Sequence, residues 1–273
     1  YGPLFSEAGT HPKAPTFQDS FVDQVESLAQ NQLMAISMNV PDVFNSAQSQ
    51  ASGSTETDYL SFFEDGGGLA ERIEERLAFA GSELEPVVTS DPKVVQGADG
   101  VLLPGVGAFR DAVCRLEDVG LADAIRKVTD HGRPYLGLCL GLQILFEEGE
   151  EHGTTRGFGV FRGKVTRFPS EVKDESGVRR PLRVPHIGWN EVRYVGDHPM
   201  IEKLPERDVY YFVHSYRPEP TDSEAVVGYA EYGGRFAAAV ARDNIFAVQF
   251  HPEKSQAAGK RLLDAYRRWL EAC

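Results

Sequence analysis

The chain has 273 residues, of which 41% are hydrophobic, so it can bury a sizeable core in one large domain or in a domain with an appendage. Its 28 basic and 41 acidic residues give a net charge of -13, which argues against nucleic-acid binding because phosphates require clustered Lys and Arg. Its three cysteines are too few and too scattered for a disulfide framework or a paired metal motif. No apolar run approaches the roughly 20 residues of a membrane helix, and the start lacks the features of a signal peptide. We therefore expect a cytoplasmic protein.

The N-terminal part differs in composition from the rest. Residues 1–58 contain a single basic residue, Lys13, and are rich in Ser, Gln, Asn and Thr toward their end. We predict a weakly ordered extension over 1–58, followed by one domain over 59–273. Within the extension, residues 21–30 have helical spacing, and residues 33–40 fit either a strand or the end of that helix.

From about residue 69 the chain alternates helix and strand patterns, which predicts an α/β domain with a mixed sheet. The expected helices cover residues 69–81, 109–131, 142–148 and 257–273. The expected strands cover residues 86–89, 100–103, 134–138, 184–190, 209–213, 225–231, 236–242 and 245–249.

A cysteine lies between two glycines where a strand gives way to a helical pattern, in Gly137-Leu-Cys-Leu-Gly141. This is the pattern of a nucleophile elbow, in which small residues permit a tight turn that projects the nucleophile. A following helix would lower the pKa of the Cys139 thiol through its N-terminal N–H groups and dipole. Taken alone, Cys139 could equally be a small buried apolar residue, and that reading is preferred for Cys114 and Cys273.

A second segment, Ile245-Phe-Ala-Val-Gln-Phe-His-Pro-Glu253, is an apolar strand that ends in a histidine. Pro252 stiffens the chain so that Glu253 can turn back and bind the imidazole of His251. A strand-end histidine by itself is more often a buried hydrogen-bonding residue. Together with the cysteine elbow, it predicts a Cys-His-Glu triad.

The two segments, Gly137-Leu-Cys-Leu-Gly-Leu-Gln143 and Phe250-His-Pro-Glu-Lys-Ser255, resemble the class I, triad-type glutamine amidotransferases. Three further segments narrow the resemblance to the glutaminase subunits of imidazole glycerol phosphate synthase: Leu103-Pro-Gly-Val-Gly-Ala-Phe109, Pro185-His-Ile-Gly-Trp-Asn190 and Tyr211-Phe-Val-His-Ser-Tyr216. The resemblance implies a flavodoxin-like mixed sheet flanked by helices. It also implies that glutamine is hydrolysed to glutamate and ammonia without a metal or organic cofactor. The ammonia would pass to a TIM-barrel cyclase subunit in a heterodimer, which forms imidazole glycerol phosphate and AICAR in histidine biosynthesis.

The resemblance also assigns roles to residues. Cys139 would be the nucleophile, His251 the base and Glu253 the group that orients the base. The oxyanion would bind the N–H of Leu140 and the Gly105–Val106 peptide, which would flip when the partner binds substrate. Without the resemblance, this segment is simply a tight turn.

The resemblance also assigns binding roles to residues that, judged from the sequence alone, are ordinary helix, strand and core residues. Glutamine would contact Gly105, Gln143, His214, Ser215 and Tyr216, and the cyclase and the ammonia exit would lie against His186, Trp189 and Asn190.

The chain departs from the family at its start, where a hydrophobic first strand and an Asp-Tyr-Gly turn are expected. Aligning backward from residue 69 places Phe63 and Glu64 at the Asp-Tyr pair. Residues 59–63 or 33–40 could supply the first strand, or the core could lack one. Three alternative functions stay open: a glutaminase for anthranilate, aminodeoxychorismate or pyridoxal phosphate synthesis, a catalytically silent binding subunit, and a peptidase with the same Cys-His pair.

Overall fold

A computed structural model of the chain describes residues 35–39, 85–173 and 176–273. The helices predicted at 21–30 and 69–81 and the candidate strand at 59–63 lie outside these ranges. No helix in the described part of the chain is long and apolar enough to span a membrane.

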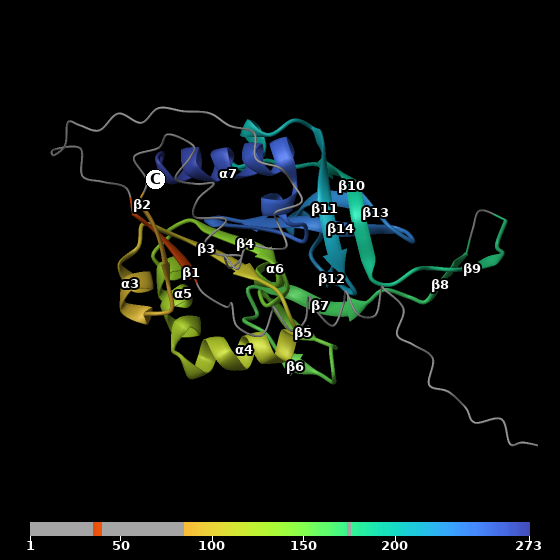
Figure 1. Cartoon of the computed structure of the whole chain (residues 1–273), viewed down its shortest axis with the longest axis horizontal. Helices are drawn as coiled ribbons and strands as arrows, with labels where there is room; N and C mark the ends of the chain where they lie inside the picture. The colour runs from red at the N-terminus through yellow and green to blue at the C-terminus, as the bar shows by residue number, and fades with distance from the viewer. Residues whose placement is uncertain (1–34, 40–84, 174–175) are drawn as a thin grey trace, which may run out of the picture.

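The described residues form a main sheet of nine strands in the order β11-β10-β13-β14-β15-β4-β3-β1-β2 (Figure 1). Strands β3, β4 and β15 run parallel, and the other neighbouring pairs are antiparallel, so the predicted mixed sheet is confirmed. The strands are β1 (Ala35–Asn39), β2 (Glu85–Thr89), β3 (Gly100–Gly105), β4 (Tyr135–Cys139), β10 (His186–Tyr194), β11 (Arg207–His214), β13 (Val226–Glu231), β14 (Arg235–Arg242) and β15 (Ile245–Val248).

Helices cover both faces of this sheet. Successive residues of a strand point to opposite faces, so one strand contributes side chains to the cores on both sides. Leu136 and Leu138 of β4 pack in the core beneath α7 (Gln256–Leu270), whereas Tyr135 packs in a second core on the other face. That second core is closed by α3 (Pro92–Gly97), α4 (Phe109–Asp118) and α5 (Leu121–Asp130). The parallel strands are therefore buried on both faces, as their near-continuous apolar sequences predict.

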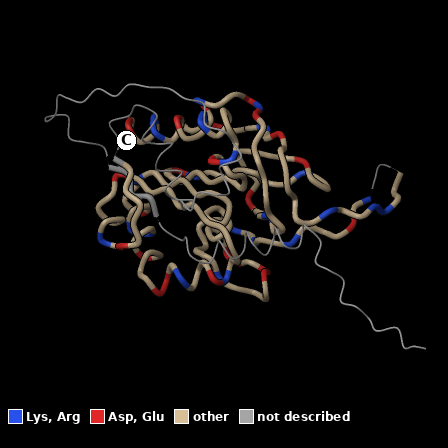
Figure 2. Tube along the Cα trace, in the orientation of Figure 1, with Lys and Arg blue, Asp and Glu red and all other residues tan. Residues whose placement is uncertain are grey.

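A smaller sheet of strands β12-β7-β5-β6 lies beside the main one, and none of these strands was predicted. Beyond it projects the hairpin of β8 and β9, which carries several basic residues (Figure 2). The bounds are β5 (Phe146–Gly149), β6 (Thr155–Arg156), β7 (Phe161–Arg167), β8 (Glu171–Lys173), β9 (Arg179–Pro181) and β12 (Tyr216–Pro220). The short 3₁₀ helices are η2 (Ile201–Lys203), η3 (Ser223–Ala225) and η4 (Pro252–Lys254).

Two of the predicted helices are wrong in extent. The helix expected over 109–131 is divided into α4 and α5 by Gly120, whose positive φ of 75° ends a right-handed helix. The helix expected over 142–148 is one turn, α6 (Leu140–Gln143), followed by strand β5. The apolar residues around Phe146 are compatible with a helix or a strand, and their pairing with β7 makes this segment a strand.

Strand β1 confirms the strand alternative for residues 33–40. It lies between β2 and β3 and is antiparallel to both. Part of the segment predicted as a separate extension thus belongs to the main sheet, and the boundary at residues 58 and 59 remains a prediction.

Candidate active site

The predicted nucleophile lies at the junction of β4 and α6. Cys139 has a φ of 52°, a strained conformation for a residue with a side chain, and such strain is characteristic of nucleophile elbows. A Cβ atom on Gly141 would overlap the carbonyl oxygen of Leu103, and one on Gly137 would overlap that of Gly141. The two glycines are therefore required by the close approach of backbone segments around the cysteine.

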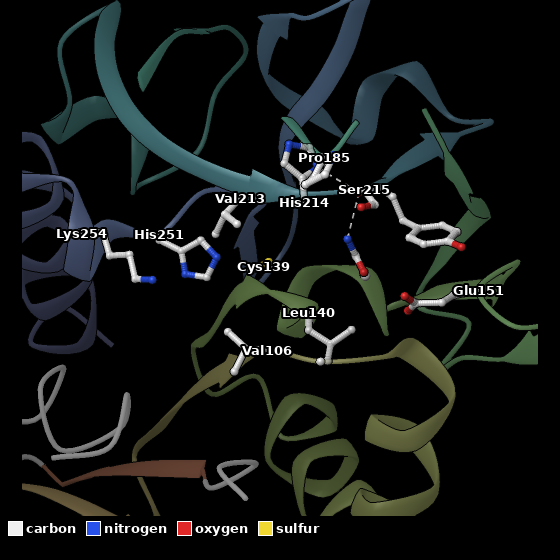
Figure 3. Close-up of a pocket in the computed structure, with 13 residues that line it drawn as sticks. Val106, Cys139, Leu140, Glu151, Pro185, Val213, His214, Ser215, His251 and Lys254 are labelled. Atoms are coloured by element: carbon white, nitrogen blue, oxygen red, sulfur yellow. Dashed lines mark hydrogen bonds between the residues drawn. The ribbon is translucent and has the colours of Figure 1, made fainter. Parts of the chain in front are cut away.

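The groups predicted for the oxyanion site lie on either side of the elbow. Leu140 begins α6, and Gly105 at the end of β3 is the register partner of Cys139. Val106 follows directly after Gly105, and its side chain points toward the same space as that of Leu140 (Figure 3). Because α6 is a single turn, it offers nearby N–H groups but a weaker dipole than the longer predicted helix would supply.

His251 reaches the cysteine because β15 is the parallel neighbour of β4. Val248 pairs with Leu138, so both chains leave the sheet at the same edge. His251 Nδ1 lies 2.7 Å from Glu253 Oε1, and both side chains are 1% exposed. The Ser255 hydroxyl donates to the His251 carbonyl over 2.6 Å, which stabilises the turn from His251 to Ser255.

The electrostatics of this group favour a charged imidazole. Burial alone would lower the pKa of His251, but Glu253 and Cys139 outweigh it and raise the pKa to about 10. The charge on His251 in turn holds the pKa of Glu253 below its usual range, although burial acts in the opposite direction. Glu253 occupies Nδ1, so Nε2 is the ring nitrogen that faces Cys139 and can exchange a proton at the sulfur.

A cavity of about 120 Å³ opens above the cysteine, enough for a small molecule rather than a single water (Figure 3). It is lined by Val106, Gly107, Cys139, Leu140, Gln143, Glu151, Pro185, Val213, His214, Ser215, Tyr216, His251 and Lys254. Among the described residues, no group of three or more His, Cys, Asp or Glu side chains is arranged to hold a metal ion.

Comparison with known proteins agrees with this geometry. The family model described as "Glutamine amidotransferase class-I" matches residues 64–265. The protein named imidazole glycerol phosphate synthase subunit HisH of Methylococcus capsulatus is 45% identical over 205 residues, which cover 75% of this chain and 93% of that protein. The HisH subunit of Aquifex aeolicus is 44% identical over 187 residues, covering 68% and 86%. The chain belongs to the class I glutamine amidotransferases. Within them, it belongs with the HisH subunits.

Solved structures support the same fold at lower identity. A crystal structure described as a glutamine amidotransferase superimposes with a TM-score of 0.51 at 20% identity and covers 74% of this chain and 94% of that one. A crystal structure described as a GMP synthase protein from Thermoplasma acidophilum gives a TM-score of 0.50 at 19% identity, covering 76% and 90%. At such identities the likeness concerns the fold alone.

Four of the residues predicted to contact glutamine line the cavity of this amidotransferase: Gln143, His214, Ser215 and Tyr216. Gln143 Nε2 donates to the Tyr216 carbonyl and to Gln249 Oε1, each over 3.1 Å. Gly105 is not among the lining residues, and a Cβ atom at this position would overlap the Cβ atom of Leu140.

His214 and His186 form a buried pair next to the cavity. His214 Nδ1 lies 2.9 Å from the Tyr216 carbonyl, which can only accept, so this nitrogen carries the proton. Burial lowers the pKa of His214 to about 3 and that of His186 to about 4, so both rings are neutral near pH 7. His214 Nε2 is then an acceptor, and His186 Nδ1 donates to it over 2.9 Å.

Of the three residues predicted to face the partner, only Trp189 is well exposed. Its side chain is 49% accessible and lies edge-on to Tyr211, with ring centres 5.9 Å apart. His186 is 3% exposed and stacks on Tyr232, whereas Asn190 donates to the Glu231 carbonyl over 2.9 Å. His186 therefore lies beneath this surface rather than on it.

The sequence prediction missed several residues that line the cavity or reach the cysteine. Glu151 lines the cavity, and its carboxylate accepts the Phe109 N–H over 2.7 Å; in the sequence it is one of several acidic residues with nothing to distinguish it. Lys254 also lines the cavity, and its place beside the His-Pro-Glu motif could have indicated this. Gln249 Nε2 lies 3.5 Å from Cys139 Sγ, and its place two residues before His251, on the same face of an extended chain, was an available signal.

Proposed function

We propose that this chain is the glutaminase subunit of an imidazole glycerol phosphate synthase and hydrolyses glutamine to glutamate and ammonia. The observation that carries the proposal is the buried Cys139, at a strained elbow, beside His251 with Glu253 bound to its far nitrogen. The membership in the HisH family supports the pathway assignment.

The chemistry begins with transfer of the Cys139 proton to His251, whose pKa Glu253 and Cys139 raise; the thiolate is the nucleophile. The sulfur attacks the side-chain carbonyl carbon of glutamine and forms a C–S bond. His251 gives a proton to the departing nitrogen, the C–N bond breaks, and ammonia leaves a thioester. Water then attacks the thioester while His251 accepts its proton, which releases glutamate and restores the cysteine.

The oxyanion that forms in both steps requires donors already in place. We assign this role to the N–H of Leu140 and to the Gly105–Val106 peptide, whose residues flank the cysteine. Removal of one such donor typically costs roughly 2.7–4 kcal/mol of transition-state stabilisation. Glycine on both sides of Val106 makes a peptide flip sterically inexpensive, so this turn is our candidate for the switch that couples activity to the partner.

We assign ammonia transfer to a TIM-barrel cyclase subunit, bound as a heterodimer, which forms imidazole glycerol phosphate and AICAR. The exposed Trp189 beside Tyr211 supports a protein interface on the outer face of β10 and β11, since aromatic residues are enriched at such surfaces. Val213 lies on the same face of β11 as Tyr211 and lines the cavity, so this face leads to the cavity.

The test is glutamate release by the purified chain, with and without a cyclase partner plus its nucleotide substrate. We expect glutamate in the complete mixture and at least a thousandfold less, on the order of the loss of other catalytic nucleophiles, with Cys139→Ala. Cys114→Ala is the matched control, because Cys114 is exposed and remote from the cavity, and it should keep full activity.

Other outcomes distinguish the alternatives. Glutamate without any dependence on the cyclase would point to a glutaminase of another pathway. No glutamate, while a HisH subunit of a relative works in the same mixture, would point to a silent binding subunit. Cleavage of peptides that depends on Cys139 would indicate a peptidase.

A further inference from the structure

Gln249 has a fully buried side chain that the chemistry above does not use. It is 0% exposed, and its backbone N–H is bound to the Ala238 carbonyl over 2.9 Å. It does not line the cavity. A buried amide is costly unless its hydrogen bonds are made, so its contacts require an explanation.

The orientation of this amide follows from a backbone carbonyl. The carbonyl of Tyr216 can only accept, so the Gln143 atom that faces it must be the NH₂ group. The same Gln143 atom faces Gln249, whose facing atom must therefore be its oxygen. The NH₂ group of Gln249 is thus directed at the sulfur of Cys139, 3.5 Å away.

We propose that Gln249 is a positioning residue that donates an N–H to the Cys139 thiolate and fixes Gln143 in the cavity wall. The proposal deepens the function proposed above and rests on it for the role of the thiolate. A hydrogen bond to a charged acceptor is stronger than one to its neutral form, so this donor favours the thiolate over the thiol. The same bond holds the sulfur in one position, toward the cavity.

Several charged or titratable groups also face the sulfur or its surroundings and would act on its titration. They are His251 after β15, Glu253 and Lys254 from η4, Glu151 after β5, and His214 from β11. None of these groups is altered by a substitution at Gln249, so a change in the titration can be assigned to the lost donor.

The experiment measures alkylation of Cys139 by iodoacetamide as a function of pH in the full chain. Cys114→Ser and Cys273→Ser leave Cys139 as the one thiol among the three cysteines of the sequence. In this background, Gln249→Met has similar length and no N–H. Gln96→Met is the matched control, because Gln96 lies exposed on α3.

We expect Gln249→Met to raise the midpoint of alkylation by about one pH unit, since a hydrogen bond to a charge shifts a pKa by roughly that much. The rate at high pH should rise about threefold, because a more basic thiolate is more nucleophilic. Gln96→Met should change neither quantity. In the complex with the cyclase, Gln249→Met should lower kcat about tenfold and raise KM, because Gln143 loses one of its two hydrogen-bond partners.

An unchanged midpoint in a folded Gln249→Met protein would overturn the proposal. Alkylation requires neither glutamine nor the partner, so a midpoint shift in a chain that does not hydrolyse glutamine would leave this inference standing while the proposed function fails. A second measurement uses the background protein without substitution at Gln249, labelled with ¹⁵N at glutamine side chains. One amide pair should titrate with the alkylation midpoint and lose this titration once Cys139 is alkylated; the absence of such a pair would also overturn the proposal.

Discussion

Two regions of this amidotransferase bury a histidine and give it opposite properties. His251, at the edge of the parallel strands, has its pKa raised to about 10. His214, at the end of antiparallel β11, has its pKa lowered to about 3. Burial opposes the charge on both rings. The difference lies in their partners, which are a carboxylate and a thiol in one case and neutral groups in the other.

The comparison teaches that partners rather than burial decide which histidine can carry a proton. Glu253 accepts from His251 Nδ1 at 2.7 Å, whereas the neutral His214 lies between a carbonyl and His186. The positive charges of His251 and Arg217 further oppose a proton on His214. One region can therefore transfer protons, and the other serves as a rigid wall of the cavity.

The largest expected effect comes from making the His251 region resemble that of His214. Glu253→Gln keeps the size of the side chain and removes its charge, so burial should bring the pKa of His251 far below 10. We expect kcat in the complex to fall by roughly 10²–10⁴. NMR titration of His251 and glutamate release measure the two effects, with Glu117→Gln on the exposed side of α4 as control. A His251 pKa that stays near 10 would show that the carboxylate is not its cause.

The two histidines also make opposite contributions to stability as the pH changes. His214 takes up a proton on unfolding, so its contribution is present above the unfolded pKa of about 6.5 and is lost as the pH falls below it toward about 3. His251 holds its proton in the fold, so its contribution is present below about 6.5 and is lost as the pH rises through about 10.

The second prediction concerns the stability that His214 loses at acid pH. His214 should account for a loss of about 2 kcal/mol in the free energy of unfolding between pH 7 and pH 5. In His214→Asn, an amide N–H can still reach the Tyr216 carbonyl, and this part of the acid loss should disappear. Urea unfolding at both pH values measures it, and His152→Asn, at an exposed histidine, should keep the loss. An equal loss in both variants would contradict the neutral state of His214.

The smallest expected effect concerns Asn190, which contacts His186 of the buried histidine pair. Asn190 Nδ2 lies 3.3 Å from His186 Nε2 and 2.9 Å from the Glu231 carbonyl. Asn190→Ala should reduce the free energy of unfolding by about 1 kcal/mol and leave both histidines neutral, because burial sets their pKa values. Urea unfolding and histidine NMR check this. A protonated His186 at pH 6 would show that Asn190, and not burial, keeps the ring neutral.

Much of the reactive region could be predicted from the sequence because each of its two segments carries a local pattern. The glycines around Cys139 and the strand before His251 are local patterns, and two apolar parallel strands end at the same edge of a sheet. The His186–His214 pair could not be predicted as a pair, since β10 and β11 bring the residues together through their register. Gln249 stands two residues before His251 in the sequence, but only the pairing of β15 with β4 brings its amide to the sulfur.

The sequence by itself determined the mixed α/β class, the glycine-flanked turn at Cys139 and the order of the residues proposed as nucleophile, base and carboxylate. Backbone sterics and the alternation of apolar residues act over a few positions, so local patterns record them. Only the tertiary structure decided that α6 stops after one turn, that residues 35–39 join the sheet beside β3, and that one buried histidine is charged while another is neutral. Those outcomes depend on strand pairing and on charges contributed by distant segments, which no local pattern records.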